Sequence, residues 1–336
     1  MIIVMHQDAS DDEVARVVDE LRARGADVHT STEGGRTVVN GTTDTRLQEE
    51  APWDAFPGVE RVVPVLRGGR RVGRAFNPTD TVVEVGDTRI GDGSLSIVAG
   101  PCAVESRDQL MAAAMAVKSA GGDILRGDAF KPRTSPYTFS GLGKAALEIL
   151  AEARQATGLP FVAEVIDPRD VELVSSYADM LRIGTRNMSN QALLWEVGRQ
   201  AKPVQLKRGR AATVDEWVDA AEHIHSQGNP NIVLVERGVR GFDRVARNTL
   251  DLTAVPVARQ VSHLPVMVDP SHASGRRDLV APLARAAVAA GADGVLIDVH
   301  PNPQEALVDG RQALTPSDFE VLVSEMRAIA SALGRS

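Results

Sequence analysis

Short apolar runs of three to five residues recur from residue 95 onward, with longer amphipathic stretches between them. Runs of this length, bounded by Gly, Pro or charged residues, predict buried strands, and the stretches between them predict helices. The alternation predicts eight strands, at Ser96–Ala99, Asp123–Leu125, Phe161–Ala163, Met180–Ile183, Val204–Leu206, Ile232–Val235, Val266–Val268 and Gly294–Ile297. Eight successive β-α units indicate a closed (β/α)8 barrel of the TIM type.

Two features refine this prediction. Residues 81–85 and 88–90 flank Gly86-Asp87 and predict a hairpin that can plug the bottom of the barrel. A doubly wound open sheet is the alternative for alternating strands and helices. No G-x-G-x-x-G motif follows the first strand, however, which makes a dinucleotide-binding sheet less favoured.

The first 66 residues predict a separate small domain. A strand at Ile2–Met5 precedes a capping box at Ser10–Glu13, which opens a helix that ends near Gly25. The remaining elements are predicted at 26–29, 37–40, 45–50 (a helix) and 59–66. The order β-α-β-β-α-β is ferredoxin-like, and by analogy such domains bind an effector or a second subunit. Residues 67–80, rich in Gly and Arg, predict a linker, so that the barrel domain covers 81–336.

Composition narrows the function. The chain has 336 residues, 43% of them hydrophobic, and a formal net charge of −8, which argues against a nucleic-acid partner. Cys102 is the single cysteine, so no intramolecular disulfide can form, as expected in a reducing cytosol. There is no basic leader followed by a long apolar run, and no apolar run has the length of a membrane span. We therefore expect a soluble cytoplasmic protein without a membrane partner.

The stretch Leu125–Gly143, LRGDAFKPRTSPYTFSGLG, follows the second predicted strand. Its prolines and glycines exclude a regular helix, so it predicts a stiffened loop. The loop carries cations and hydroxyls together, at Arg126, Lys131, Arg133, Thr134 and Ser135. Charge-assisted hydrogen bonds from Arg and Lys, supplemented by hydroxyls, are typical of phosphate binding.

Ionisable residues follow nearly every predicted strand, at the end of a barrel where active sites lie. Glu164 follows the third strand, and a cationic set is expected at the mouth, comprising Arg126, Lys131, Arg133, Arg186, Lys207 and Arg237. Burying so many cations without partners would be costly. The site should therefore hold several negative charges, such as a carboxylate and one or two phosphates.

A second set follows the first, seventh and eighth strands, which are neighbours in a closed barrel. It consists of one thiol, one imidazole and two carboxylates, at Cys102, His272, Asp298 and Asp309. Such a mixture suits Mn²⁺, Fe²⁺, Co²⁺ or Zn²⁺. A lone cysteine is usually a small buried hydrophobe, and neither CxxC nor HExxH is present, so spacing alone does not decide for a metal. Beside phosphates, a Lewis acid could polarise an aldehyde or activate water during carbon–carbon bond formation.

Seven segments, read in order, resemble the type I 3-deoxy-D-arabino-heptulosonate 7-phosphate (DAHP) synthases: GPCAVES, LRGDAFKPRTSPYTFSGLG, RIGTRNMSN, QLKRG, ERGVRGF, DPSHASGRRDLV and ADGVLIDVHPNP. The first 66 residues are similar to the ferredoxin-like regulatory domain of one branch. The resemblance implies condensation of phosphoenolpyruvate with D-erythrose 4-phosphate and water, with release of phosphate, as the first step of the shikimate pathway. It also implies a homotetramer and an aromatic amino acid or pathway product as effector.

The resemblance also implies roles for single residues. Phosphoenolpyruvate would contact Arg126, Lys131, Arg186, Lys207 and Arg237. The erythrose phosphate would contact Arg133, Thr134 and Ser135. The divalent metal would be held by Cys102, His272, Asp298 and Asp309. Glu164 matches a glutamate near the attacking water, and Lys131 is expected to be the general acid for the new alkoxide.

The sequence departs from the family pattern in places, and alternatives remain. Asp298 replaces the usual glutamate, which shortens its reach by ~1.5 Å. Ala273-Ser274 replaces Gly-Thr, and Gly241 stands where Thr is usual. The nearest alternative is a sibling synthase that uses arabinose 5-phosphate, but that sibling carries KANRS in place of KPRTS. A paralogue with another acceptor and a catalytically weak regulatory barrel are the others.

Overall fold

The computed structural model describes residues 2–33, 36–42, 52–63, 70–133, 135 and 137–335. The chain divides into two compact units, Met1–Asn77 and Pro78–Ser336, and the division falls within the stretch predicted as a linker. Each unit is described by itself. Within the described ranges, no helix combines the length and the apolar composition that crossing a bilayer requires.

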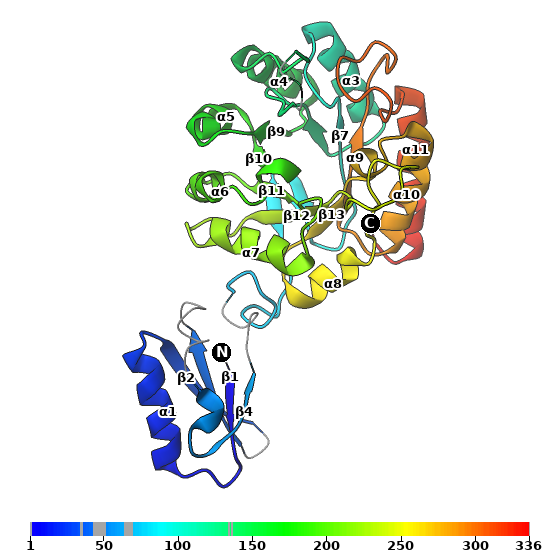
Figure 1. The fold of residues 1–336 in the computed structure, drawn as a ribbon. Helices are drawn as coiled ribbons and strands as arrows, with labels where there is room; N and C mark the ends of the chain where they lie inside the picture. Colours follow the sequence, from blue (N-terminus) through cyan, green and yellow to red (C-terminus); the bar gives the residue numbers. More distant parts are fainter. Residues whose placement is uncertain are drawn as a thin grey trace. The chain divides into compact units, whose positions relative to one another are not determined.

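The N-terminal unit is a four-stranded antiparallel sheet with a helix on one face (Figure 1). Its elements are β1 (Ile2–Met5), α1 (Asp11–Ala23), β2 (Asp27–Glu33), β3 (Arg36–Thr42), a short 3-10 helix (Trp53–Ala55) and β4 (Val59–Val63). The strand order β2-β3-β1-β4 is ferredoxin-like, as predicted. The capping box opens α1, and Val17 and Leu21 pack against Ile3 in the core. The helix predicted at 45–50 lies outside the described residues.

The second unit is a closed barrel of eight parallel strands, in the order β10-β11-β12-β13-β14-β7-β8-β9. Its strands are β7 (Ser96–Gly100), β8 (Ile124–Arg126), β9 (Phe161–Val165), β10 (Met180–Ile183), β11 (Val204–Lys207), β12 (Ile232–Glu236), β13 (Val266–Val268) and β14 (Gly294–Asp298). The predicted barrel is confirmed, and its closure rules out the open-sheet alternative.

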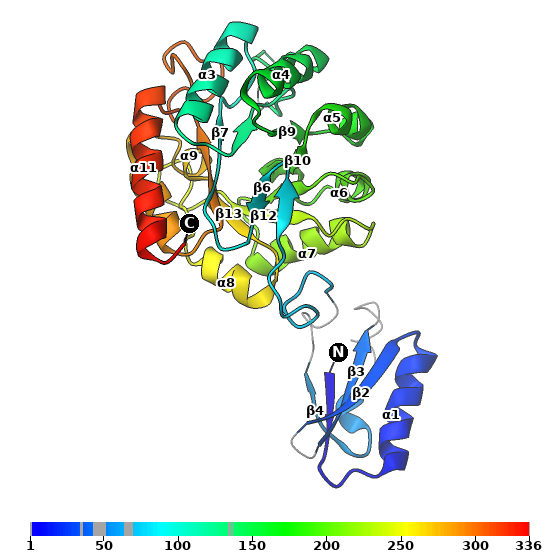
Figure 2. The same cartoon turned by 180° about the vertical axis from the view of Figure 1, so that it is seen from behind.

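Helices surround this barrel in both views (Figures 1 and 2). They are α3 (Arg107–Ser119), α4 (Lys144–Thr157), α5 (Val171–Tyr177), α6 (Gln191–Gly198), α7 (Val214–His225), α8 (Ala254–Val261), α10 (Arg277–Ala289) and α11 (Pro316–Ala332), and the short α9 (Pro270–Ser274) follows β13. The cap signals read from sequence act as expected, because Thr213 accepts from the Glu216 N–H and Thr315 from the Asp318 N–H.

The interior of the barrel changes from apolar to polar along the strands. At one end, the hairpin β5 (Val83–Val85) and β6 (Thr88–Ile90) shares a hydrophobic cluster with strand residues such as Val98 and Leu296. At the carboxyl end, the interior positions are ionisable and buried. Several strands run one or two residues further than predicted, so Arg126, Lys207 and Asp298 are final strand residues rather than loop residues. The sheet backbone therefore fixes their positions.

Candidate active site

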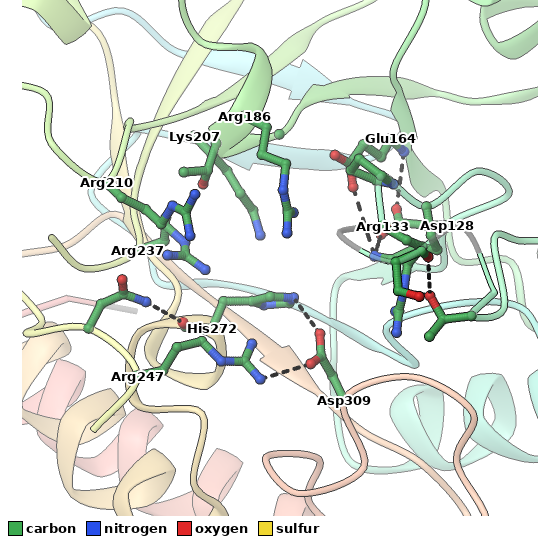
Figure 3. Close-up of a pocket in the computed structure, with 17 residues that line it drawn as sticks. Asp128, Arg133, Glu164, Arg186, Lys207, Arg210, Arg237, Arg247, His272 and Asp309 are labelled. Atoms are coloured by element: carbon green, nitrogen blue, oxygen red, sulfur yellow. Dashed lines mark hydrogen bonds and ion pairs between the residues drawn. The ribbon is translucent and has the colours of Figure 1, made fainter. Parts of the chain in front are cut away.

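A cavity of about 380 Å³ opens at the carboxyl ends of the strands (Figure 3). Its lining includes these predicted residues: Lys131, Arg133, Ser135, Glu164, Arg186, Lys207, Arg237, His272 and Asp309. Cys102, Arg126 and Asp298 lie beneath this lining and are buried. Thr134 lies outside the described residues. The prediction did not single out Asp128, Arg210, Arg247 and Asn248, which also line the cavity.

The four predicted metal ligands are brought together. One candidate ligand atom from each of Cys102, His272, Asp298 and Asp309 lies within 4.8 Å of all the others. The Cys102 thiol is 3.5 Å from Nε2 of His272 and donates to Oδ2 of Asp309 over 3.3 Å. Burial raises the pKa of this thiol to about 12, against the influence of Lys131. The thiol therefore keeps its proton until a cation displaces it.

A second layer orients the imidazole of His272. Asp269 accepts from Nδ1 at 2.9 Å and also from the His272 backbone N–H. This contact directs Nε2 toward Cys102 and Asp309, which is the arrangement typical of a metal-bound histidine. A thiol, an imidazole nitrogen and two carboxylates therefore fit a borderline divalent cation.

Asp298 contacts both the metal cluster, through His272, and the buried Arg126. One carboxylate oxygen pairs with Arg126, and the other accepts from Nε2 of Gln312 at 2.6 Å and lies 3.6 Å from Nδ1 of His272. Arg126 is fully buried and also donates to the Cys102 carbonyl at 3.0 Å. Its guanidinium is not among the groups that line the cavity in this structure.

Asp128 gathers four donors on one buried carboxylate. Its Oδ2 accepts from Arg126 at 2.9 Å and from Lys131 at 2.7 Å. Its Oδ1 accepts from the Glu164 N–H at 3.1 Å and pairs with Arg182. Burial alone would raise the pKa of Asp128, but Arg182, Lys131 and Arg126 outweigh it and hold the pKa well below its usual range. Asp128 therefore stays ionised, and its negative charge offsets the positive charges of Arg126, Lys131 and Arg182.

Lys131 sits between Asp128 and the metal cluster. Its Nζ donates to the Cys102 carbonyl at 3.1 Å and to the Cys102 sulfur at 3.2 Å, and lies 3.9 Å from Oε2 of Glu164. Burial alone would lower the pKa of Lys131, but Asp128, Cys102 and Glu164 raise it above its ordinary value. The amine therefore carries its proton at neutral pH.

Gly184 leaves room for the Glu164 carboxylate, which a β-carbon at this position would overlap.

The opposite wall is cationic. Lys207 on this wall donates to Asp269 at 2.5 Å, whereas Arg247 lies beside the metal cluster and donates to Oδ1 of Asp309 at 2.9 Å (Figure 3). Arg237 is mostly buried, and Asn248, with its amide oriented to satisfy both atoms, accepts from it at 2.9 Å. Burial lowers the pKa of Arg237, and the nearby cations Arg247 and Arg210 lower it further. This wall is therefore prepared for anions.

Arg133 and Ser135, the loop residues predicted to contact the erythrose phosphate, are partly exposed. Nε of Arg133 donates to the Thr138 hydroxyl at 3.0 Å, and the Ser135 hydroxyl accepts from the Tyr137 N–H at 3.4 Å. Both Arg133 and Ser135 line the cavity, so the loop delivers a cation and a hydroxyl to it.

Among the residues that the prediction missed, Asp128 stands inside the motif that attracted attention and Arg210 follows QLKRG directly. Extending each motif by one residue, and counting acidic as well as basic side chains, would have found both. Arg247 lies far along a loop, and we find no sequence signal that points to it.

Comparisons with known proteins agree with this geometry. The DAHP synthetase I family model matches residues 77–333, and the DAHP synthase ferredoxin-like domain matches residues 1–67. Phospho-2-dehydro-3-deoxyheptonate aldolase of Thermotoga maritima is 45% identical over 334 residues, covering 99% of both chains. A 2-dehydro-3-deoxyphosphooctonate aldolase of Syntrophotalea carbinolica is 32% identical over 74% of this chain and 96% of its own length.

Solved structures give the same result. The crystal structure of the Thermotoga maritima DAHP synthase superposes with a TM-score of 0.82 at 44% identity, over 100% of this chain and 98% of that one. A truncated form of the synthase from the same organism matches with a TM-score of 0.74 at 47% identity, over 79% of this chain and 97% of that one. The predicted resemblance is thus confirmed, and the chain belongs to the DAHP synthetase I family of enzymes.

Proposed function

We propose that this enzyme condenses phosphoenolpyruvate with D-erythrose 4-phosphate and water to give DAHP and phosphate. The observation that carries the proposal is the pairing of two walls across one cavity. His272 and Asp309 of the metal cluster line one side of the cavity together with Arg247, and a group of cations faces them: Arg186, Lys207, Arg210 and Arg237 (Figure 3). A reaction that joins an enol phosphate to an aldehyde needs electrophilic activation on one side and anion binding on the other.

The substrates carry a carboxylate and two phosphates, and the cavity offers separate places for them. Family motifs and the cavity lining together support phosphoenolpyruvate beside Arg186, Lys207 and Arg237, with Lys131 at its reacting end. The same argument supports erythrose 4-phosphate at Arg133 and Ser135, and the family motif alone adds Thr134. Arg126 would act from beneath, by holding Asp298 and Asp128 in place.

A divalent cation held by Cys102, Nε2 of His272, Asp298 and Asp309 would supply Lewis-acid polarisation of the aldehyde oxygen. We propose Mn²⁺, Fe²⁺, Co²⁺ or Zn²⁺, because a mixed thiol, imidazole and carboxylate set suits these ions better than Mg²⁺ or Ca²⁺.

The side chains account for the proton movements. C3 of the enol phosphate forms the new bond to the aldehyde carbon, and the aldehyde oxygen takes a proton from Nζ of Lys131. Glu164 orients water toward C2 and accepts its proton as the C2–O bond forms. The hemiketal then collapses: the bond between C2 and the phosphate oxygen breaks, its electron pair leaves with the phosphate, and the C2 hydroxyl gives its proton to the departing phosphate as the C2 carbonyl forms. Glu164 lies 3.9 Å from Lys131, close enough for a proton to return through one water.

The experiment is a substrate comparison. Loss of phosphoenolpyruvate is followed with erythrose 4-phosphate and with arabinose 5-phosphate, with and without a chelator. Turnover of erythrose 4-phosphate that stops with chelator and returns with Mn²⁺ supports the proposal. Turnover of arabinose 5-phosphate alone would favour the octulosonate reaction named for the 32% identical relative. No turnover with either aldose would leave a regulatory barrel.

For regulation and assembly, we propose that the ferredoxin-like domain binds an aromatic amino acid or a pathway product, in a homotetramer located in the cytoplasm. The match of residues 1–67 to the family's ferredoxin-like domain supports the effector role. Titration with candidate amino acids and light scattering test the effector and the tetramer respectively.

A further inference from the structure

The cations that line the cavity fall into two groups. Lys131, Lys207 and Arg247 each have a carboxylate partner, in Asp128, Asp269 and Asp309 respectively. Within the described part of the chain, the other lining cations have no ion pair: Arg133, Arg186, Arg210 and Arg237. Arg186, Arg210 and Arg237 project into the same region of the cavity, whereas Arg133 lies with Asp128 and Glu164 across from them (Figure 3).

The backbone at Arg210 is tied to the neighbouring strand exit. The Arg210 carbonyl accepts from the Arg240 N–H at 2.7 Å, which joins the loop after β11 to the loop after β12. The loop after β12 also closes on itself through a bridge between Val239 and Thr249. The half-buried Arg210 side chain therefore extends into the cavity from a backbone held on two sides.

The charges around Arg210 repel one another. Burial lowers the pKa of Arg210, and its neighbours Arg240 and Arg186 lower it further. Arg237 has only 7% of its surface exposed, and its buried Nε has no hydrogen-bond partner. Three guanidinium groups without carboxylates, one of them buried, are stabilised when an anion with several oxygens binds between them.

We propose that Arg210 is a further substrate-binding residue, which joins Arg186 and Arg237 to bind the phosphate group of the enol phosphate. This inference rests on the proposed function. A phosphate monoester offers three non-bridging oxygens and close to two negative charges, which match three guanidinium groups better than one carboxylate does. Arg133 on the facing side then remains for the second phosphate, so the two phosphates bind at opposite ends of the cavity.

The test compares Arg210→Gln with the unaltered enzyme by calorimetric titration with phosphoenolpyruvate and with inorganic phosphate. A charged hydrogen bond of ordinary strength predicts that both affinities fall about tenfold or more. KM for phosphoenolpyruvate should rise by a similar factor, while KM for erythrose 4-phosphate and kcat change little. Arg210→Lys should lie between the two, because a lysine keeps the charge and loses the planar fork.

Arg240→Gln is the matched control, because Arg240 is exposed, adds positive charge beside Arg210 and does not line the cavity. It should change either affinity by less than about twofold, as expected for a solvent-screened charge. Circular dichroism and thermal melting verify that each variant folds, and a misfolded Arg210→Gln is replaced by Arg210→Lys.

Two results would overturn the inference. One is unchanged affinity of Arg210→Gln for both anions, and the other is a rise in KM for erythrose 4-phosphate instead of phosphoenolpyruvate. Failure of the unaltered enzyme to turn over erythrose 4-phosphate would remove the proposed function. The titration with inorganic phosphate would then still decide whether Arg210 binds phosphate.

Discussion

The guanidinium of Arg126 and the carboxylate of Asp298 form an ion pair in which neither side chain has any exposed surface. Because Arg126 also binds the Cys102 carbonyl and Asp128, it connects the proposed metal cluster to the floor of the cavity. The family resemblance places a glutamate at position 298. This chain has an aspartate there, and one of its carboxylate oxygens is paired with Arg126.

Asp298→Asn should destabilise the protein, because it leaves Arg126 buried with one carboxylate instead of two. Breaking a buried pair in this way costs about 3–5 kcal/mol. Urea unfolding measures this difference.

Asp298→Glu adds about 1.5 Å of reach and should bind Mn²⁺ more tightly than the unaltered chain. A calorimetric titration in which Asp298→Glu binds Mn²⁺ more weakly would contradict the proposed role of this position.

Cobalt offers a direct view of the proposed Cys102 ligand. A Co²⁺ ion bound by a thiolate should show a sulfur-to-metal charge-transfer band in the near ultraviolet. Cys102→Ala should abolish this band, and no other residue can replace it because Cys102 is the single cysteine. Persistence of the d–d bands without the charge-transfer band in the unaltered protein would show that Co²⁺ binds elsewhere.

Gly184→Ala should impair turnover without unfolding the barrel. The added methyl group overlaps the Glu164 carboxylate and forces this side chain to move. A displacement of about 1 Å at a reacting group costs on the order of 100-fold in rate, and kcat measures it. The double variant Gly184→Ala/Glu164→Asp serves as the control, since the shorter acid should relieve the overlap and restore the melting temperature. A single variant with normal kcat would count against a role for Glu164.

Acid should destabilise the protein through Asp128. Its pKa in the folded state lies well below that of an unfolded aspartate, so its stabilising effect is complete above about pH 4 and is lost as the pH falls further. Urea unfolding at about pH 6 and about pH 3 should show this loss. Asp128→Asn should be less stable at the higher pH and lose less on acidification. Equal losses in both proteins would argue against this explanation.

A chain that begins at Pro78 should keep its turnover and lose its response to aromatic amino acids. Residues 78–336 form their own compact unit, and a truncated Thermotoga maritima synthase matches 79% of this chain. Inhibition curves with tyrosine, phenylalanine and tryptophan, compared with the full chain, provide the measurement. Undiminished inhibition would place the effector site on the barrel.

The sequence was sufficient for the barrel because its signals are local. Apolar runs such as Met180–Ile183 and Val266–Val268 have the same bounds in the structure as in the prediction. Motif order also indicated the thiol, imidazole and carboxylates that now lie together.

The division of charge within the cavity could not be predicted in this way. Asp128 pairs with Arg182, which is 54 positions away in the sequence, and Lys207 pairs with Asp269, which is 62 positions away. No local sequence pattern predicts which cations form ion pairs with carboxylates, because these pairs form only when barrel closure brings distant strands together. Arg126 illustrates the limit, since its charge predicted a substrate contact but not the buried ion pairs with Asp128 and Asp298.

The hairpin at the bottom of the barrel has a consequence for how the chain folds. Val83, Val85 and Ile90 belong to the same cluster as Leu296, more than 200 positions later in the sequence. The hairpin is synthesised before any barrel strand, yet the surface that receives it is complete only when β14 closes the ring. Contacts between segments so far apart form slowly, because a long loop must be ordered first. Docking of the hairpin should therefore be one of the last steps of folding.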